Sequence, residues 1–279
     1  MIKISVSIVL HNTSHDLINN LIDCCSKSIS KVDIFLIDNS QTNSLNYLDR
    51  DNRVRYLKAQ KNGGFGAGHN LAIQNYDILN KYDYHIVINP DIEFGNNVIG
   101  DLLDFMKNNR DVGILMPKIL NIDGSLQYAR RLLPSPFDIF MKRFFPSSIV
   151  SSNYEMRTME SKIAVEIPSL CGCFMFLRTS ALKSEGLFDE NYFMYFEDID
   201  LSRRISKNYS SVYFPNSKVI HFSNNEHRRS VKLFLYSLRS ALRYFNKWGY
   251  IDSDRVNINS DTVQKIITLN NEFSSRAKI

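Results

Sequence analysis

Apolar runs and amphipathic stretches alternate along the first part of the chain. Segments rich in apolar residues predict buried strands at residues 1–10, 32–38, 53–57, 84–88 and 112–116. Between these runs, apolar side chains recur at helical spacing from Ser14 or His15 onward, around Leu71 to Ile73, and from Val98 to Asn108. Strands that alternate with helices in this way predict an α/β fold.

The second half of the chain is less regular. Three prolines and a serine-rich patch interrupt the pattern from Leu132 to Glu166, so we expect an irregular excursion over the active-site face there. The later elements predicted are a strand at 168–178, a helix at 181–185, a helix from about Asp198, strands at 211–214 and 218–222 around a Pro215-Asn216 turn, an amphipathic helix at 231–248 and a last helix near 263–269.

Size and composition limit the class of protein. The 279 residues are 44% hydrophobic and 23% charged, which is typical of a globular protein with one large domain or one domain plus an appendage. The N-terminal apolar run is too short for a signal peptide, and no later window approaches the about 20 apolar residues of a membrane span. We therefore expect a cytoplasmic protein. The cysteines at 24, 25, 171 and 173 match no common zinc spacing.

The net charge of +5 is unevenly distributed along the chain. Much of the positive excess lies from His227 to Lys232 and at Arg239, Arg243 and Lys247 of the predicted 231–248 helix. The apolar face of that helix carries Leu235, Leu238, Leu242 and Phe245. A basic amphipathic helix packs on its own domain, pairs with another chain or lies on an anionic membrane. Nucleic acid, an anionic membrane and a phosphorylated substrate all stay open as partners.

Polar residues follow several of the predicted strands. Asp38 ends one strand, and ligands of open α/β sheets collect at that edge. The segment from Asn62 to Asn70 holds four glycines, which form either a flexible turn or a loop that approaches phosphate before a helix N-terminus. Asp91 and Glu93 follow a later strand, where they either form a turn or share a divalent cation such as Mg²⁺ or Mn²⁺.

An acidic segment from Tyr195 to Leu201 sets three carboxylates among aromatic and apolar residues. A carboxylate that is partly shielded from water binds its proton more tightly, so its pKa can rise toward that of a general base. Acidic residues at a helix N-terminus also serve simply as caps, and both interpretations stay open. His221, at the end of a predicted strand, is either a core histidine or a ligand.

Several motifs follow one another in a characteristic order. They are His11-Asn12, Ile37-Asp38-Asn39-Ser40, Asn62-Gly63-Gly64-Phe65-Gly66, Asn89-Pro90-Asp91, Cys171-Gly172-Cys173-Phe174-Met175, Phe188-Asp189-Glu190 and the segment from Phe196 to Leu201. In this order they resemble family 2 glycosyltransferases with the GT-A fold, and most of all the bacterial rhamnosyltransferases. The resemblance implies a mixed sheet flanked by helices in a catalytic domain at 1–226, with a C-terminal helical region at 227–279.

The resemblance also implies a nucleotide-sugar site. Asp38 would bind the nucleobase by accepting the N3–H of thymine or uracil, and Asn62 and Gly63 would line the same pocket. The other residues implied in this site are His11, Asn12, Gly64, Phe65, Asn70, Asn89, Arg228 and Arg229. The last two would close over the diphosphate.

A metal site is implied beside it. Asp91 matches the last acid of a DxD-like motif whose earlier acid is replaced here by Asn89, so the cation would bind with the nucleotide diphosphate present. Glu93 is a compensating ligand, and His221 matches a histidine of the metal shell. The cation would be Mg²⁺ or Mn²⁺, which stabilises the departing diphosphate.

Asp198 matches the general base of the family, and Glu197 would orient it or bind the acceptor. In an inverting transfer, the base removes the proton of the acceptor hydroxyl as it attacks the anomeric carbon. The implied donor is dTDP-L-rhamnose, and the implied acceptor is a saccharide, often carried on polyprenyl diphosphate at the cytoplasmic membrane, which the 231–248 helix would contact. No nucleic-acid partner is implied.

Other interpretations are a UDP-sugar donor (galactofuranose, GlcNAc or galactose) on the same scaffold, a nucleotidyltransferase, and a noncatalytic sugar- or nucleic-acid-binding protein. The last of these leaves Asp91, Asp198 and the glycine segment unexplained.

Overall fold

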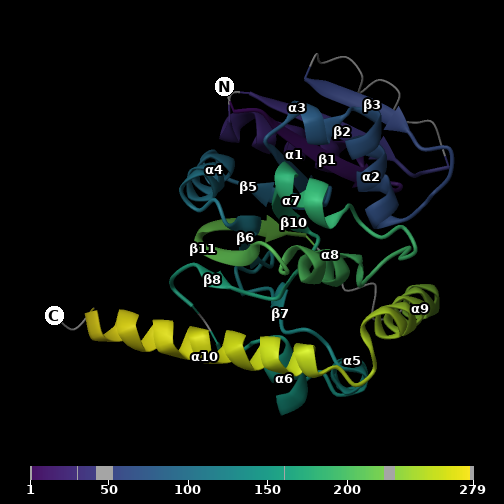
Figure 1. The fold of residues 1–279 in the computed structure, drawn as a ribbon. Helices are drawn as coiled ribbons and strands as arrows, with labels where there is room; N and C mark the ends of the chain where they lie inside the picture. Colours follow the sequence, from purple (N-terminus) through teal and green to yellow (C-terminus); the bar gives the residue numbers. More distant parts are fainter. Residues whose placement is uncertain (1, 30, 42–52, 160, 223–229, 277–279) are drawn as a thin grey trace.

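A nine-stranded sheet forms the centre of the computed structural model, which describes residues 2–29, 31–41, 53–159, 161–222 and 230–276 (Figure 1). Its strands are β1 (Ile4–Leu10), β2 (Val32–Asp38), β3 (Val54–Lys58), β4 (Tyr84–Ile88), β5 (Ile92–Phe94), β6 (Val112–Leu120), β8 (Val165–Glu166), β10 (Phe174–Arg178) and β11 (Ser210–His221). A separate two-stranded sheet joins β7 (Arg130–Arg131) to β9 (Ser169–Leu170). The five apolar runs predicted as strands in the first part of the chain all form strands of the central sheet.

The central sheet is mixed. Its order is β3-β2-β1-β4-β10-β6-β11-β5, and β8 pairs with β11. The first four strands are parallel, whereas β10 is antiparallel to both β4 and β6. Leu10 pairs with Asp38, and Ile8 pairs with Ile88, so β1, β2 and β4 end at the same edge. Polar residues that follow these strands are thereby brought together.

Helices cover both faces of the sheet. The helices α1 (His15–Ser28) and α4 (Val98–Asn108) contact each other on one face. Four helices form a row on the other face, each in contact with the next (Figure 1). They are α2 (Phe65–Asn75), α3 (Ile78–Lys81), α7 (Thr179–Glu185) and α8 (Glu197–Ile205). The two faces follow from right-handed crossovers, because the chain moves one way across the sheet from β1 to β2 and the opposite way from β3 to β4.

The start of α1 shows how local sequence sets these elements. Ser14 caps the helix by accepting the N–H of Leu17, and Ile18, Leu21 and Cys25 are buried at the spacing of one helix face. The side chains of α1 therefore pack on the sheet as the apolar pattern predicts.

Several predicted boundaries differ in the structure. The strand predicted at 168–178 is divided into β9 and β10, with a turn between them. Helix α2 begins at Phe65, inside the glycine segment, and not after it. The strands predicted at 211–214 and 218–222 form one strand, β11, with a register shift between Phe214 and Lys218. Pro215 is tolerated there because a bulge leaves its position without a ladder hydrogen bond.

The segment predicted as an irregular excursion, 132–166, is partly helical. It contains α5 (Pro136–Phe144) and α6 (Ile149–Tyr154). Ser135 and Asp138 form a capping box, and Pro136 occupies the first turn of α5. Proline fits the first helical turn because its missing N–H would have no partner there. Pro136, which suggests an interruption in the sequence, therefore lies at the start of a helix.

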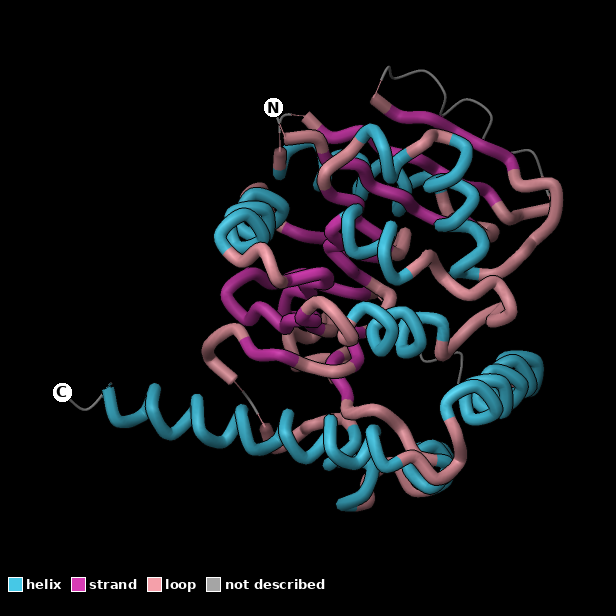
Figure 2. Tube along the Cα trace, in the orientation of Figure 1, coloured by secondary structure: helices cyan, strands magenta, loops and turns pink. Residues whose placement is uncertain are grey.

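Two helices follow in the C-terminal region (Figure 2). Helix α9 (Val231–Trp248) has its predicted bounds, whereas α10 (Ser253–Arg276) is longer than the helix predicted near 263–269. The amide of Asn259 on α10 bonds both the N–H and the carbonyl of Leu133, at 2.9 Å each. Within the described part of the chain, no helix has both the length and the apolar character to cross a membrane.

Candidate active site

Asp38 ends β2 at the polar edge of the sheet, and its side chain has no exposed surface. Its Oδ1 accepts the N–H of Ser40 at 2.8 Å, and its Oδ2 accepts from the Tyr56 hydroxyl at 2.7 Å and from Lys58 Nζ at 3.0 Å. Burial alone would raise the pKa of Asp38, but these hydrogen bonds outweigh it and hold the pKa below its usual range. Both oxygens are engaged, so contact with a nucleobase requires one of these bonds to open.

The glycine segment packs closely on another part of the chain. Gly64 has φ +92°, and a Cβ atom there would lie 1.8 Å from the carbonyl oxygen of Phe193. Phe65 N–H donates to the same carbonyl at 3.0 Å. The Asn39 amide donates to Gly64 O at 3.1 Å, and Asn62 Oδ1 accepts the Gly64 N–H at 3.0 Å. Only glycine fits position 64, because the backbone conformation and the close approach both exclude a side chain.

His11, Asn12 and Gly63 lie near Asp38 at the open edge of the sheet. His11 and Asn12 are exposed beyond β1, and Asn12 N–H donates to the Ser40 hydroxyl at 2.8 Å. Gly63 is half-buried beside the Asn39-bonded Gly64. The structure thus brings together the residues predicted around the nucleotide from three separate loops.

Asn70 lies deeper than predicted. It is 2% exposed on α2, and its Nδ2 donates to Phe188 O at 2.8 Å and to Glu190 Oε1 at 2.9 Å. Its Oδ1 accepts the Phe188 N–H at 3.1 Å. These bonds engage the whole amide, so Asn70 holds the segment before α8 in place and presents no free group to a nucleotide.

Three of the side chains predicted near a metal come together where β4 and β11 end. His221 Nε2 lies 3.3 Å from Asp91 Oδ1 and 3.4 Å from Asn89 Nδ2. Gln127 Oε1 lies 2.9 Å from His221 Nδ1 and accepts its proton in the tautomer that leaves a lone pair on Nε2. Two ligands of one Mg²⁺ ion, each at about 2.1 Å, lie about 3 Å apart. Asp91 and His221 therefore fit as neighbouring ligands of a divalent cation.

Glu93 does not join this group. Its carboxylate accepts from Asn20 of α1 at 3.2 Å. Residues 91 and 93 would face one way only in extended backbone, but Asp91 lies in a turn and β5 begins at Ile92. No group of three or more His, Cys, Asp or Glu suited to a metal occurs among the described residues, so substrate oxygens would have to complete the shell. The predicted Arg228 and Arg229 lie outside the described residues.

Asp198 lies at the start of α8 and contacts the loop before β10. Its Oδ2 accepts the N–H of Gly172 at 3.0 Å, and its Oδ1 accepts the N–H of Ile199 at 2.8 Å. The carbonyl of the next residue, Cys173, accepts the N–H of Asn89 at 2.9 Å. The loop at 171–173 therefore joins Asp198 directly to the group formed by Asn89, Asp91 and His221.

Glu197 and Asp198 have different environments. Glu197 is 5% exposed, and its Oε2 has no hydrogen-bond partner among the described residues. Burial, and then the charge of Asp198, raises the pKa of Glu197 well above its ordinary value. The burial from water that the sequence pattern predicts for the general base is therefore found at Glu197. Asp198 is only half-buried and is the carboxylate of the two that a substrate can reach.

The turn before α8 is strained. Tyr195 and Phe196 have φ values of +69° and +70°, in the left-handed region. Each such residue costs about 1 kcal/mol or more when it is not glycine. The Phe196 ring packs on Tyr244 and Phe245 of α9, with centroids 5.5 and 6.3 Å apart. Packing of α9 thus supports the turn that presents Glu197 and Asp198.

Asp200 joins α8 to α9. Its side chain has no exposed surface, and its Oδ1 lies 2.8 Å from both Lys247 Nζ and Trp248 Nε1. Its Oδ2 accepts from Arg204 Nε at 2.9 Å. Lys247 also pairs with Asp189 at 2.9 Å. At least this basic residue of α9 therefore serves internal packing.

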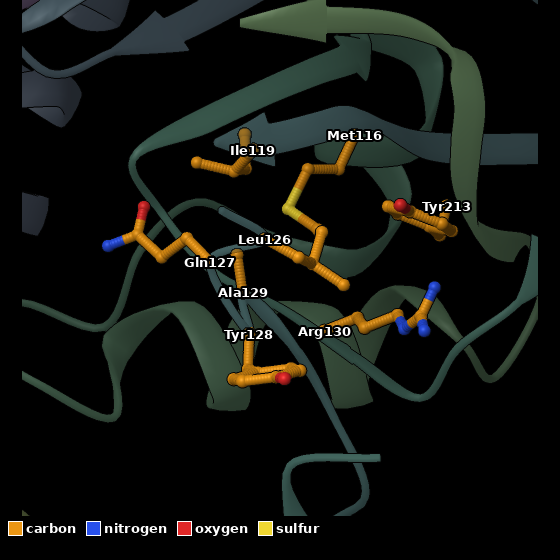
Figure 3. A pocket seen from close by; sticks show the side chains of 8 residues that line it. All are labelled: Met116, Ile119, Leu126, Gln127, Tyr128, Ala129, Arg130 and Tyr213. Atoms are coloured by element: carbon orange, nitrogen blue, oxygen red, sulfur yellow. The ribbon is translucent and has the colours of Figure 1, made fainter. Parts of the chain in front are cut away.

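A small hollow lies behind Gln127 and is no substrate pocket (Figure 3). It is lined by Met116, Ile119, Leu126, Gln127, Tyr128, Ala129, Arg130 and Tyr213, and it leaves no room for a water molecule. In Figure 3 the Gln127 side chain points away from the others. Its Oε1 is the atom that lies 2.9 Å from His221 Nδ1. The guanidinium of Arg130 lies 4.5 Å from the centroid of the Tyr213 ring.

Tyr56, Lys58 and Gln127 belong to the site but carry no sequence motif. Tyr56 and Lys58 are two residues apart and so lie on the same face of β3, and Asp38 pairs with Lys58 in the sheet. The β2–β3 register is needed to see that both point at Asp38. Gln127 lies in a segment without a hydrophobic pattern, so nothing in the sequence signals its bond to His221.

The family model described as glycosyl transferase family 2 matches residues 5–186. The chain belongs to glycosyl transferase family 2. The family predicted from the motifs is thereby confirmed. The match includes the Asp38, Gly64 and Asp91 motifs of this family 2 chain and ends before Asp198 and His221.

Curated relatives of this family 2 chain include two named rhamnosyltransferases. The N-acetylglucosaminyl-diphospho-decaprenol L-rhamnosyltransferase of Mycobacterium tuberculosis is 32% identical over 204 residues, which are 68% of this chain and 66% of that protein. Rhamnosyltransferase WbbL of Escherichia coli is 29% identical over 191 residues, which are 65% of this chain and 70% of that protein. The chain thus spans just under two thirds of the length of the M. tuberculosis relative.

Solved structures with the same fold are more distant in sequence. GalNAc-T7, crystallised with UDP, GalNAc and Mn²⁺, has a TM-score of 0.61 at 17% identity and covers 88% of this chain and 48% of that one. S. aureus TarS has a TM-score of 0.57 at 14% identity and covers 88% of this chain and 40% of that one. These likenesses confirm the predicted GT-A fold, with its mixed sheet flanked by helices and its C-terminal helices.

Proposed function

We propose that this family 2 chain is an inverting hexosyltransferase that moves L-rhamnose from dTDP-L-rhamnose to a saccharide carried on polyprenyl diphosphate. The product would belong to a bacterial surface polysaccharide such as O-antigen or capsule. The observation that carries the proposal is the loop at 171–173, which joins Asp198 to the group of Asn89, Asp91 and His221. A carboxylate base beside a diphosphate-binding metal site is what inverting sugar transfer requires.

Each part of the site has a role in this proposal. Asp91 and His221 would hold Mg²⁺ or Mn²⁺ through Oδ1 and Nε2, and the cation supplies charge stabilisation to the departing diphosphate. Asp198 would take the proton of the acceptor hydroxyl as it attacks from the opposite face of the anomeric carbon. A β-linked donor would therefore give an α-linkage. Burial raises the pKa of Glu197 well above its usual range, and Asp198 is the more accessible carboxylate of the pair.

The relatives' names support the rhamnosyl donor. A UDP-sugar, carrying galactofuranose, GlcNAc or galactose, is the second candidate, because GalNAc-T7 and TarS were both crystallised with UDP. Asp38 does not separate the two, since thymine and uracil both carry an N3–H. Membership of family 2 removes the reason to consider a nucleotidyltransferase.

A lipid-linked acceptor would be met at a membrane surface. The apolar side chains of Leu235, Leu238 and Leu242 on α9 are about half exposed. Arg143 of α5 lies over the Phe234 ring of α9, 4.8 Å from its centroid, so the two helices are adjacent. We extend the proposal to a peripheral contact of this surface with the inner face of the cytoplasmic membrane, where exposed leucines would enter the interface.

Calorimetric titration with dTDP, UDP and GDP, with and without Mn²⁺, tests the proposal. We expect dTDP to bind most tightly and only with Mn²⁺. His221→Ala should abolish the effect of Mn²⁺, whereas His15→Ala, at an exposed histidine of α1, should preserve it. Metal-independent binding, or no binding of any nucleotide, would contradict the proposal.

A further inference from the structure

Arg131 lies beside Asp198 and has no part in the mechanism above. It is on β7, where it pairs with Ser169 of β9, and the N–H of Cys171 donates to Ala129 O at 2.9 Å. This pairing sets β7 against the 171–173 loop that binds Asp198. Figure 1 shows β7 between α8 and the helices α5 and α6.

Among the described residues, the guanidinium of Arg131 has no ion-pair partner. Its Nε is buried without a hydrogen-bond acceptor, and no carboxylate among the described residues lies within ion-pair distance of it. Burial opposes its charge, but the nearby acidic groups of Tyr154, Cys171 and Asp198 outweigh burial and raise its pKa. A buried donor without an acceptor is unfavourable, so an anionic ligand at Arg131 would be stabilised.

A second cation approaches the same place from α5. Lys142 Nζ lies 2.9 Å from Glu155 Oε1, and Arg157 takes the other oxygen of that carboxylate. Burial, and then the positive charge of Arg131, lowers the pKa of Lys142 to about 8. Lys142 and Arg157 thus share the carboxylate of Glu155, and Arg131 lies near enough for its charge to act on Lys142.

The contacts arrange the site in a definite order. Along the 171–173 loop, Asn89 is bonded at one end, Asp198 in the middle, and β7 with Arg131 at the other end. In an inverting displacement the leaving group and the attacking hydroxyl lie on opposite sides of the anomeric carbon, and the base lies with the hydroxyl. The side of Asp198 away from the metal group is therefore the acceptor side.

We propose that Arg131 and Lys142 bind the phosphate groups of the acceptor, a saccharide diphosphate attached to a lipid. This inference rests on the proposed function and names the chemistry by which the acceptor is recognised. A guanidinium and an ammonium near each other suit a diphosphate, which offers several charged oxygens to both.

Exposed aromatic side chains on α5 favour a ligand whose diphosphate carries a lipid. Phe137, Phe140 and Phe144 are 58%, 51% and 57% exposed, on the same helix as Lys142. The rings of Phe140 and Phe144 lie 4.9 Å apart, so they form one apolar surface. Lys142 lies on the opposite face of α5, toward Glu155, so this surface does not contact the diphosphate itself and suits the lipid phase from which the acceptor's chain extends.

Calorimetric titration of citronellyl diphosphate into protein saturated with dTDP and Mn²⁺ tests the site, because the donor pocket is then filled. Arg131→Gln should weaken binding about tenfold or more, as expected for lost hydrogen bonds to a charged group. Lys142→Gln should weaken it about threefold or more. Lys107→Gln, which removes an exposed charge on α4, should leave the affinity within about twofold.

The same titration separates the possible outcomes. Unchanged affinity in both the Arg131 and Lys142 variants, or no binding once dTDP is bound, would overturn the site. Equal affinity for inorganic pyrophosphate and citronellyl diphosphate would overturn the lipid part. Lys142 is 32% exposed, so its variant keeps the test available should Arg131→Gln not fold. The dTDP titration is independent: its failure contradicts the proposed function, whereas normal dTDP binding without any effect of Arg131→Gln overturns only the acceptor site.

Discussion

Two buried histidines should make the fold sensitive to mild acid. His85 and His69 have no exposed surface, and serines of β1 bond both rings. Ser5 Oγ lies 2.8 Å from His85 Nδ1, and Ser7 Oγ lies 2.8 Å from His85 Nε2 and 2.6 Å from His69 Nδ1. Burial lowers the pKa of His85 to about 3, and burial and then the charge of His85 lower the pKa of His69.

The loss of stability follows from the protons that only the unfolded chain binds. An unfolded histidine titrates near its ordinary pKa of 6.5. Below that pH the unfolded state therefore binds a proton, whereas folded His85 stays neutral until the pH approaches its lowered pKa. Stability is therefore full at pH 8 and falls as the pH drops below 6.5. At pH 5, about 1.5 units lower, His85 alone contributes a loss of about 2 kcal/mol. His69 acts in the same direction.

Urea unfolding at pH 8 and pH 5, followed by the fluorescence of the single tryptophan, Trp248, measures this loss. His85→Gln keeps hydrogen-bonding groups for both serines but cannot titrate, so it should lose about 2 kcal/mol less than the wild type between the two pH values. His15→Gln, at an exposed histidine, should behave as the wild type. Equal losses in wild type and His85→Gln would refute the reasoning.

Three further substitutions test other parts of the account. Gly64→Ala should abolish dTDP binding in calorimetry and destabilise the fold by about 2 kcal/mol or more, whereas Gly95→Ala, in open space, should do neither. Asp200→Ala should lower the free energy of unfolding in urea by about 3–5 kcal/mol, because it removes the buried carboxylate that accepts from Arg204, Lys247 and Trp248; a loss under about 1 kcal/mol would contradict its role between α8 and α9. Leu238→Asp, at a side chain 46% exposed, should weaken sedimentation with phosphatidylglycerol vesicles at unchanged melting temperature, and unchanged sedimentation would argue against a membrane contact there.

The sequence predicts the fold well where periodicity and local signals agree. The strands β1, β2 and β4 are rich in apolar residues because both faces are covered by helices, and Ser14 marks the start of α1. The pattern fails where tertiary contacts decide. Of the apolar stripe predicted on α9, the leucines at 235, 238 and 242 are exposed and Phe245 is buried, and the domain also buries Ser240, Ala241 and Tyr244.

The sequence likewise predicts only part of the candidate site. Asp91 and His221 meet as predicted, because each follows a strand that ends at one edge. The displacement of Glu93 depends on a turn at Asp91 that alternation along the sequence does not reveal. The contribution of Arg131 depends on the pairing of β7 with β9, two residues each, which is too short for any periodic signal.

The rate of sugar transfer by Asp198→Asn tests the central claim most directly. The amide keeps the size of the side chain but cannot take the proton of the acceptor hydroxyl. With dTDP-L-rhamnose and a lipid diphosphate acceptor, kcat should fall about a hundredfold or more, and dTDP affinity should stay within about twofold of wild type. A kcat within about tenfold of wild type, at normal dTDP affinity, would show that Asp198 is not the base.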